Sequence, residues 1–134
     1  MDYGWTIWDE DFAHPQYKKY IGDRLAYIAL AKIYDYRNYS LNEYGSPYMY
    51  TATVKDGYVY FYFNNVGWGL QAEDGELNIR GFTNYDTGAM LNATLESENC
   101  VKVRIGNKKN ITIAYGDSAM ANRATCNLCN SSGI

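Results

Sequence analysis

An aspartate and a histidine three positions apart, Asp11 and His14, are the side chains of this chain best suited to catalysis. A serine hydroxyl becomes an effective nucleophile when an imidazole accepts its proton, and a carboxylate must orient that imidazole and stabilise its charged form. One turn carrying both groups would supply the base and its orienting acid together. His14 is the only histidine, so any imidazole chemistry depends on it. The alternative is that His14 only caps the following helix or faces solvent.

Three cysteines, Cys100, Cys126 and Cys129, offer a second kind of chemistry. A structural zinc site takes four ligands, and only His14 could join these thiols, so we expect neither a metal nor another cofactor. The Cys-x-x-Cys pair also lacks the βαβ surroundings of a redox site. A disulfide from Cys100 to one of the pair, or within the pair, stays open and depends on whether the parent protein is exported.

Composition narrows the classes of partner. The net charge is −3 and no lysine or arginine cluster is present, so we expect no nucleic-acid binding. No apolar stretch is long enough to span a membrane, and we expect no signal peptide at the start of the chain. The location is therefore unknown, with a secreted or periplasmic parent left open. The length of 134 residues suits one compact domain, too short for a complete hydrolase with a second domain.

Residues 15–34 are predicted to form one helix, with Pro15 at its first position. Ile21, Leu25 and Ile28 recur at helical spacing. The second half of the segment is apolar on nearly all sides, and such a helix needs covering on more than one face. We therefore expect a packing partner that the chain lacks.

The period changes from helix to strand after residue 47. Residues 48–55 and 58–64 alternate on either side of Asp56-Gly57, a two-residue hairpin turn. Further strands are predicted near 77–82, 100–105 and 111–115, whereas the last twenty residues look irregular. Short strands separated by turns indicate a mainly β fold, an antiparallel β-sandwich-like domain preceded by one long α-helix. The 15 tyrosines suit sheet surfaces that are half buried, and they also suit stacking on sugar rings.

These features resemble the sialate O-acetylesterases, which are carbohydrate esterases of the SGNH type. The resemblance covers most of the chain and is carried by Asp11-Phe12-Ala13-His14-Pro15, Gly22, Arg24-Leu25-Ala26, Ala29, Tyr34, Phe63-Asn64-Asn65-Val66-Gly67, Gly69-Leu70, Leu77, Gly81-Phe82, Val101-Lys102-Val103, Ile113-Ala114-Tyr115, Asn127-Leu128 and residues 131–134. It implies that residues 1–35 are the C-terminal segment of an SGNH α/β hydrolase domain and that residues 36–134 are a β-sandwich domain.

The same resemblance implies a serine esterase that removes O-acetyl groups from sialic acid or related sugars. His14 corresponds to its general base, and Asp11 to the orienting acid, with Asp9 as the alternative. The family's nucleophile lies far upstream in a turn that this chain lacks, so the chain alone is expected to be inactive. Gly116-Asp117-Ser118 spells the start of an SGNH nucleophile block, but it follows the last predicted strand, where we expect a loop.

Two functions from different classes follow. The first is the C-terminal part of a carbohydrate esterase, with an O-acetylated sugar as substrate and the upstream catalytic domain as partner. An exposed apolar helix would also make the isolated chain self-associate. The second is a non-catalytic carbohydrate-binding module, which would bind glycans by aromatic stacking. A binding module should bind sugar alone, whereas an esterase tail should not.

Overall fold

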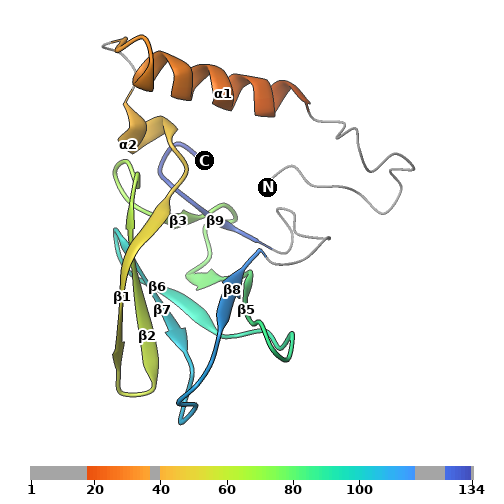
Figure 1. Cartoon of the computed structure of the whole chain (residues 1–134). Helices are drawn as coiled ribbons and strands as arrows, with labels where there is room; N and C mark the ends of the chain where they lie inside the picture. The colour runs from red at the N-terminus through yellow and green to blue at the C-terminus, as the bar shows by residue number, and fades with distance from the viewer. Residues whose placement is uncertain (1–17, 37–39, 117–125, 134) are drawn as a thin grey trace, which may run out of the picture.

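The structure, a computed structural model, describes residues 18–36, 40–116 and 126–133. Within these ranges the chain forms α1 (Lys18–Lys32), α2 (Leu41–Tyr44), β1 (Tyr48–Lys55), β2 (Tyr58–Asn64), β3 (Gln71–Ala72), β4 (Asn78–Ile79), β5 (Phe82–Asn84), β6 (Ala93–Ser97), β7 (Cys100–Arg104), β8 (Ile113–Tyr115) and β9 (Leu128–Cys129). All the strand pairs are antiparallel, and the helices precede the β part (Figure 1). The predicted mainly β, antiparallel fold is therefore confirmed.

The largest sheet has five strands in the order β1-β2-β7-β6-β4, and β3–β9 and β5–β8 form two separate ribbons. The β1–β2 hairpin coincides with the two predicted strands and turns at Asp56 and Gly57. Both turn residues have positive φ, 52° and 80° respectively, as a tight hairpin whose twist matches its strands requires. Local sequence thus specifies this hairpin.

The core lies between the large sheet and the ribbons. Val101 and Val103 on β7 are completely buried. Phe61 on β2 stacks on Phe82 of β5, with ring centroids 5.7 Å apart. The β5–β8 ribbon therefore packs against the apolar face of the sheet, which gives the sandwich-like arrangement.

The structure differs from the predicted strands in one segment. Residues 77–82 were expected to form a single strand, but they divide into β4 and β5 at Gly81, where φ is 110°. A Cβ atom at Gly81 would lie 2.8 Å from the Tyr115 ring and 2.9 Å from the Cys126 sulfur. Before the break, β4 belongs to the large sheet, and after it, β5 belongs to the β5–β8 ribbon. One alternating segment therefore contributes strands to both layers of the sandwich.

Three strands, β3, β6 and β9, were not predicted from the sequence. Strand β6 lies between β7 and β4 in the large sheet. Strand β9 forms in the tail that looked irregular, because Leu128 pairs with Ala72, which is distant in sequence. A two-residue strand has no periodicity of its own, and only its tertiary partner defines it.

Helix α1 lies within the predicted segment 15–34 and stands off the β part, beside α2 (Figure 1). Apolar side chains stay accessible on one side of it: Leu25 is 63% exposed, and Ile33, just after the helix, is 73% exposed. The division into 1–35 and 36–134 stays a prediction. Neither described helix has both the length and the apolar character that crossing a bilayer demands.

Candidate functional site

The predicted catalytic pair and its neighbours lie outside the described residues. These are His14, Asp11, the alternative acid Asp9, and Ser118 of the Gly-Asp-Ser sequence. Helix α1 begins at Lys18, four positions after His14. The residues that hold α1 on the β part therefore bear on where the pair is presented, and they can be described.

Helix α1 is attached through α2 and the segment that follows it. The rings of Tyr27 on α1 and Tyr44 on α2 are 5.0 Å apart between centroids, in a tilted arrangement. The Arg24 guanidinium donates to the Ser46 hydroxyl at 3.5 Å. These contacts lie on one side of α1, and residues 27–31 are half-buried, whereas Leu25, Ala26 and Lys32 are exposed.

Asn130 in the C-terminal segment anchors α2 to the β part. Its side chain is completely buried. The amide nitrogen donates to the carbonyl oxygens of Glu43 at 2.8 Å, Gly45 at 3.1 Å and Asn65 at 3.3 Å. The amide oxygen accepts from the backbone N–H of Ser132 at 2.9 Å. One side chain therefore ties the end of α2 to the loop after β2 and to the C-terminal turn.

The loop after β2 presents an exposed indole on this anchored frame. The backbone N–H of Trp68 donates to the Ser131 hydroxyl at 2.9 Å, while the Trp68 side chain is 88% exposed. Packing is the usual role of a tryptophan, and the described residues do not provide it here. An exposed indole on a loop that is fixed by hydrogen bonds offers a flat apolar face to a partner domain or to a sugar ring.

Asn127 organises a second polar cluster at the other side of β9. It is 1% exposed, accepts from the backbone N–H of Arg80 at 2.7 Å, and donates to the Asn78 carbonyl at 3.0 Å. It also donates to the Asp74 carboxylate at 3.2 Å, and Asp74 pairs with the Arg80 guanidinium at 2.6 Å. The cluster closes the loop between β3 and β4.

Competing effects act on the pKa of Asp74. Partial burial raises it, but the backbone N–H of Glu76, the side chains of Arg80 and Asn127, and the Arg80 charge together hold it below its ordinary value. The carboxylate is thus kept charged by partners that are all structural. Nothing in this arrangement resembles a general base, whose pKa should lie near neutral pH.

The cysteines form no disulfide in the structure. Cys100 is buried, and burial raises the pKa of its thiol, which a hydrogen bond from Tyr62 opposes without reversing. The Cys129 thiol donates to the Gln71 carbonyl at 3.5 Å. Within residues 18–36, 40–116 and 126–133, no histidine, cysteine and carboxylate side chains gather in a way that would hold a metal ion.

Asn127 and Asn130 were not predicted to position other residues. The last twenty residues look irregular in sequence, and neither amide was given a structural role. The available signal is modest: two asparagines enclose the short apolar pair Leu128-Cys129 in an otherwise polar tail. Buried polar side chains need partners, so an asparagine beside buried residues is typical of a bridge between loops.

Comparison with models of protein families found no match, and comparison with curated protein sequences found none either. Among solved structures, the chain is similar to a carbohydrate acetylesterase from Xanthomonas citri, with a TM-score of 0.74 and 26% sequence identity. The similarity covers 99% of this chain but only 29% of the acetylesterase chain. This chain is thus related to a carbohydrate esterase and corresponds in length to less than a third of it.

Proposed function

We propose that this chain is the C-terminal part of a serine carbohydrate esterase that removes O-acetyl groups from sialic acid or related sugars. The observation that carries this proposal is the similarity of nearly the whole chain to 29% of a carbohydrate acetylesterase. The choice of sialic acid rests on the sequence resemblance alone. The remaining part of the enzyme, upstream, would supply the nucleophilic serine.

In this mechanism His14 takes the proton from the serine hydroxyl as its oxygen attacks the acetyl carbonyl. The imidazolium then gives that proton to the departing sugar oxygen, which leaves an acetyl-serine. A water molecule, activated by the same imidazole, releases acetate and restores the serine. Asp11, or Asp9 in its place, holds the imidazole in the correct tautomer and stabilises its charge.

The anchoring of α1 supports this division of roles. The histidine precedes α1 by four residues, and α1 is joined to the β part through α2 and the Asn130 side chain. A catalytic base must lie within hydrogen-bond reach of its nucleophile, so its support has to be rigid. In the proposed enzyme the β domain provides that support.

The upstream domain is proposed to cover the exposed side of α1. Leu25, Ile33 and Tyr34 are 63%, 73% and 72% exposed, although they are large apolar side chains. In the isolated chain the same side would pair two copies. We expect Leu25→Glu to reduce concentration-dependent self-association, measured by sedimentation velocity. Thr53→Glu on the exposed strand β1 adds the same negative charge away from the helix, and an equal reduction there would contradict pairing through the apolar side.

Acetate release tests the missing nucleophile. The purified chain should release no acetate from a 9-O-acetylated sialic acid or from an aryl acetate, and neither should its His14→Ala variant. Turnover that disappears in His14→Ala would show that a serine within the chain completes the triad, which contradicts the proposal.

The residue roles are tested in the polypeptide that joins this chain to the upstream domain. There, His14→Ala should lower kcat by about 10⁴-fold or more. Asp11→Asn and Asp9→Asn, assayed side by side, identify the orienting acid as the one whose loss is the larger. Unchanged kcat in His14→Ala would remove the proposed base.

The exposed indole of Trp68 favours a second candidate, a non-catalytic carbohydrate-binding module. That function predicts that the isolated chain binds sialic acid or a related sugar and that Trp68→Ala abolishes binding. His14→Ala should leave such binding unchanged. Isothermal titration with both variants distinguishes the two functions, because an esterase tail should bind no sugar alone.

A further inference from the structure

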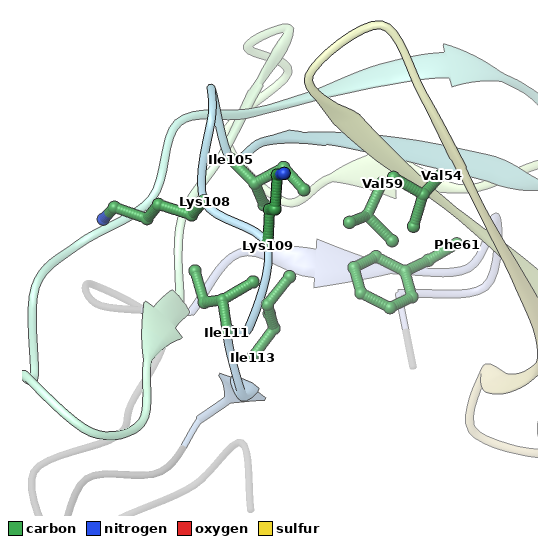
Figure 2. Close-up of a pocket in the computed structure, with 8 residues that line it drawn as sticks. All are labelled: Val54, Val59, Phe61, Ile105, Lys108, Lys109, Ile111 and Ile113. Atoms are coloured by element: carbon green, nitrogen blue, oxygen red, sulfur yellow. The ribbon is translucent and has the colours of Figure 1, made fainter.

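An apolar pocket with a volume of about 530 Å³ lies at the free end of the β1–β2 hairpin, away from α1. Figure 2 shows the side chains that line it. They come from β1, β2 and the segment that runs from the end of β7 to β8, and they are Val54, Val59, Phe61, Ile105, Lys108, Lys109, Ile111 and Ile113. Its size falls within the range of about 300–1,000 Å³ typical of small-molecule pockets.

The walls of this pocket are held in place by backbone hydrogen bonds. The N–H groups of Ile105 and Gly106 both donate to the carbonyl oxygen of Gly57, at 2.9 Å and 3.0 Å. These bonds join the tip of the hairpin to the end of β7. Val59 is 7% exposed and Val54 is 70% exposed, so the pocket has a buried floor and an open side. It therefore exists without a ligand to shape it.

The chemistry of the lining excludes a sugar and favours an alkyl chain. Six of the lining residues are aliphatic or aromatic hydrocarbons, and none is an acid, an amide or a hydroxyl that could bond to sugar hydroxyls. The one aromatic ring, Phe61, is already stacked on Phe82. Burying methylene groups is favourable in proportion to the apolar area removed from water.

The two polar lining residues are both lysines, which sets the charge of the ligand. The ion pairs of the described residues involve Lys19, Arg80 and Lys102, so none of those pairs uses Lys108 or Lys109. Figure 2 shows the amine of Lys108 directed away from the apolar side chains, whereas Lys109 is seen between Ile105 and Val59. A cation beside an apolar pocket complements an anionic head group.

We propose that this pocket binds the alkyl chain of an anionic amphiphile of the fatty-acid class, with its carboxylate beside Lys109. The pocket would hold the chain between the β1–β2 hairpin and the segment before β8. The site lies at the opposite end of the molecule from α1 (Figure 1), so it is separate from the helix surface that the upstream domain would cover. It does not depend on the esterase function.

Titration calorimetry of the full chain tests this site with defined probes below their micellar concentrations. Octanoate, decanoate and dodecanoate should bind one per chain, with affinity rising about fourfold for each methylene buried. Dodecyltrimethylammonium, with the same alkyl chain and a cationic head, should bind at least about tenfold more weakly than dodecanoate. Equal affinity of the two dodecyl probes, or no binding of dodecanoate, would overturn the proposal.

Two variants and a control locate the binding. Lys109→Glu is an exposed change and should weaken dodecanoate binding about fivefold or more through loss of attraction and added repulsion. Lys32→Glu on α1 makes the same change of charge far from the pocket and should leave affinity unchanged. Equal weakening by both would overturn the assignment of the carboxylate to Lys109.

Ile111→Trp fills the pocket and should weaken binding about tenfold or more, because the indole occupies the space that the alkyl chain needs. Its circular dichroism spectrum establishes that it is folded. Unchanged binding would overturn the site. If dodecanoate fails to bind and sedimentation shows a dimer that Ile111→Trp dissociates, a second copy fills the pocket and the proposal is also wrong.

Discussion

Strand β7 and helix α1 are both rich in apolar residues, yet they end in opposite environments. Val101 and Val103 of β7 are 0% exposed, whereas Leu25 of α1 is 63% exposed. The strand lies between β2 and β6 with a ribbon over its apolar face, and the helix contacts α2 on one side. The β part therefore completes its own core within this chain, and the helix does not.

The difference shows which element can bury its apolar side chains against other parts of the same chain. A strand buries its side chains as soon as neighbouring strands and one covering layer form, and this chain supplies all of them. The second half of α1 is apolar on nearly all sides and needs cover on several faces, and α2 is only four residues long. The helix therefore indicates a partner, which in the proposed function is the upstream domain.

The largest expected effect comes from placing a charge in each region. Val101→Glu buries an unpaired carboxylate and should destabilise the chain by about 4 kcal/mol or more, enough to unfold a marginally stable domain. Leu25→Glu introduces the same side chain on α1 and should change the free energy of unfolding by less than about 0.5 kcal/mol at protein concentrations too low for two copies to pair. Urea denaturation followed by circular dichroism measures both.

A large loss of stability in Leu25→Glu would break the contrast between the two regions. It would mean that the helix is already buried in solution, in a dimer for example. Repeating the measurement at several protein concentrations separates that case, because the stability of a dimer depends on concentration.

The next largest effect concerns the junction between the regions. Asn130→Ala removes the donor to three carbonyl groups and the acceptor for the Ser132 N–H, and should cost about 2–4 kcal/mol. Because these bonds hold α2, hydrogen exchange should rise first at the N–H groups of Tyr44 and Gly45. Exchange that rises equally on β7 would contradict a local role at the junction.

A smaller effect is expected where the chain passes between two layers of the β part. Gly81→Ala should destabilise by about 2 kcal/mol, because its φ is 110° and the added methyl would meet Tyr115 and Cys126. Gly75→Ala is the control, since φ is 74° there but nothing lies within 4 Å of the added atom. Equal losses in the two variants, measured by thermal unfolding, would show that only backbone strain matters at Gly81.

The smallest effect is a dependence on pH within the β part. Asp74 has a pKa held below its ordinary value of 3.8, so its partners stabilise the folded state above that pH. This contribution should be lost as the pH falls below about 3.8 through the lower folded pKa. Asp74→Asn should therefore lower stability at pH 6 more than at pH 2.5. An equal loss at both values would contradict the shift.

Glu76→Gln provides the matched control for this measurement. Its carboxylate lies 3.7 Å from the same Arg80 guanidinium, whereas Asp74 lies 2.6 Å from it. The variant should keep the acid-dependent loss of stability, because the Asp74 contacts remain.

Prediction from sequence succeeded where structure is local. The two strands around Asp56-Gly57 and the helix within 15–34 follow from periodicity and turn chemistry, which act between near neighbours. It failed at Gly81, which splits one alternating run between two layers. It also failed at β9, whose partner Ala72 is far away in the chain.

The candidate site divides in the same way. Asp11 and His14 are candidates from residue type and spacing, and their roles stay a prediction outside the described residues. Asn130 and Asn127 had no sequence signal strong enough to name them, because their importance comes from burial among carbonyl groups of distant loops. The exposure of Trp68 could not be predicted either, since the same local sequence suits a packed turn.

By itself, the sequence determined the kind of fold: an apolar helix, an alternating hairpin and short strands separated by turns. Steric preferences between near neighbours and hydrophobic periodicity do not depend on the tertiary structure, so they can be recognised in the sequence alone. Only the tertiary structure decided which strands share a sheet, which amides bridge loops and which apolar side chains stay exposed. Those outcomes depend on contacts between segments distant in sequence, and burial is a property of the assembled core rather than of any residue.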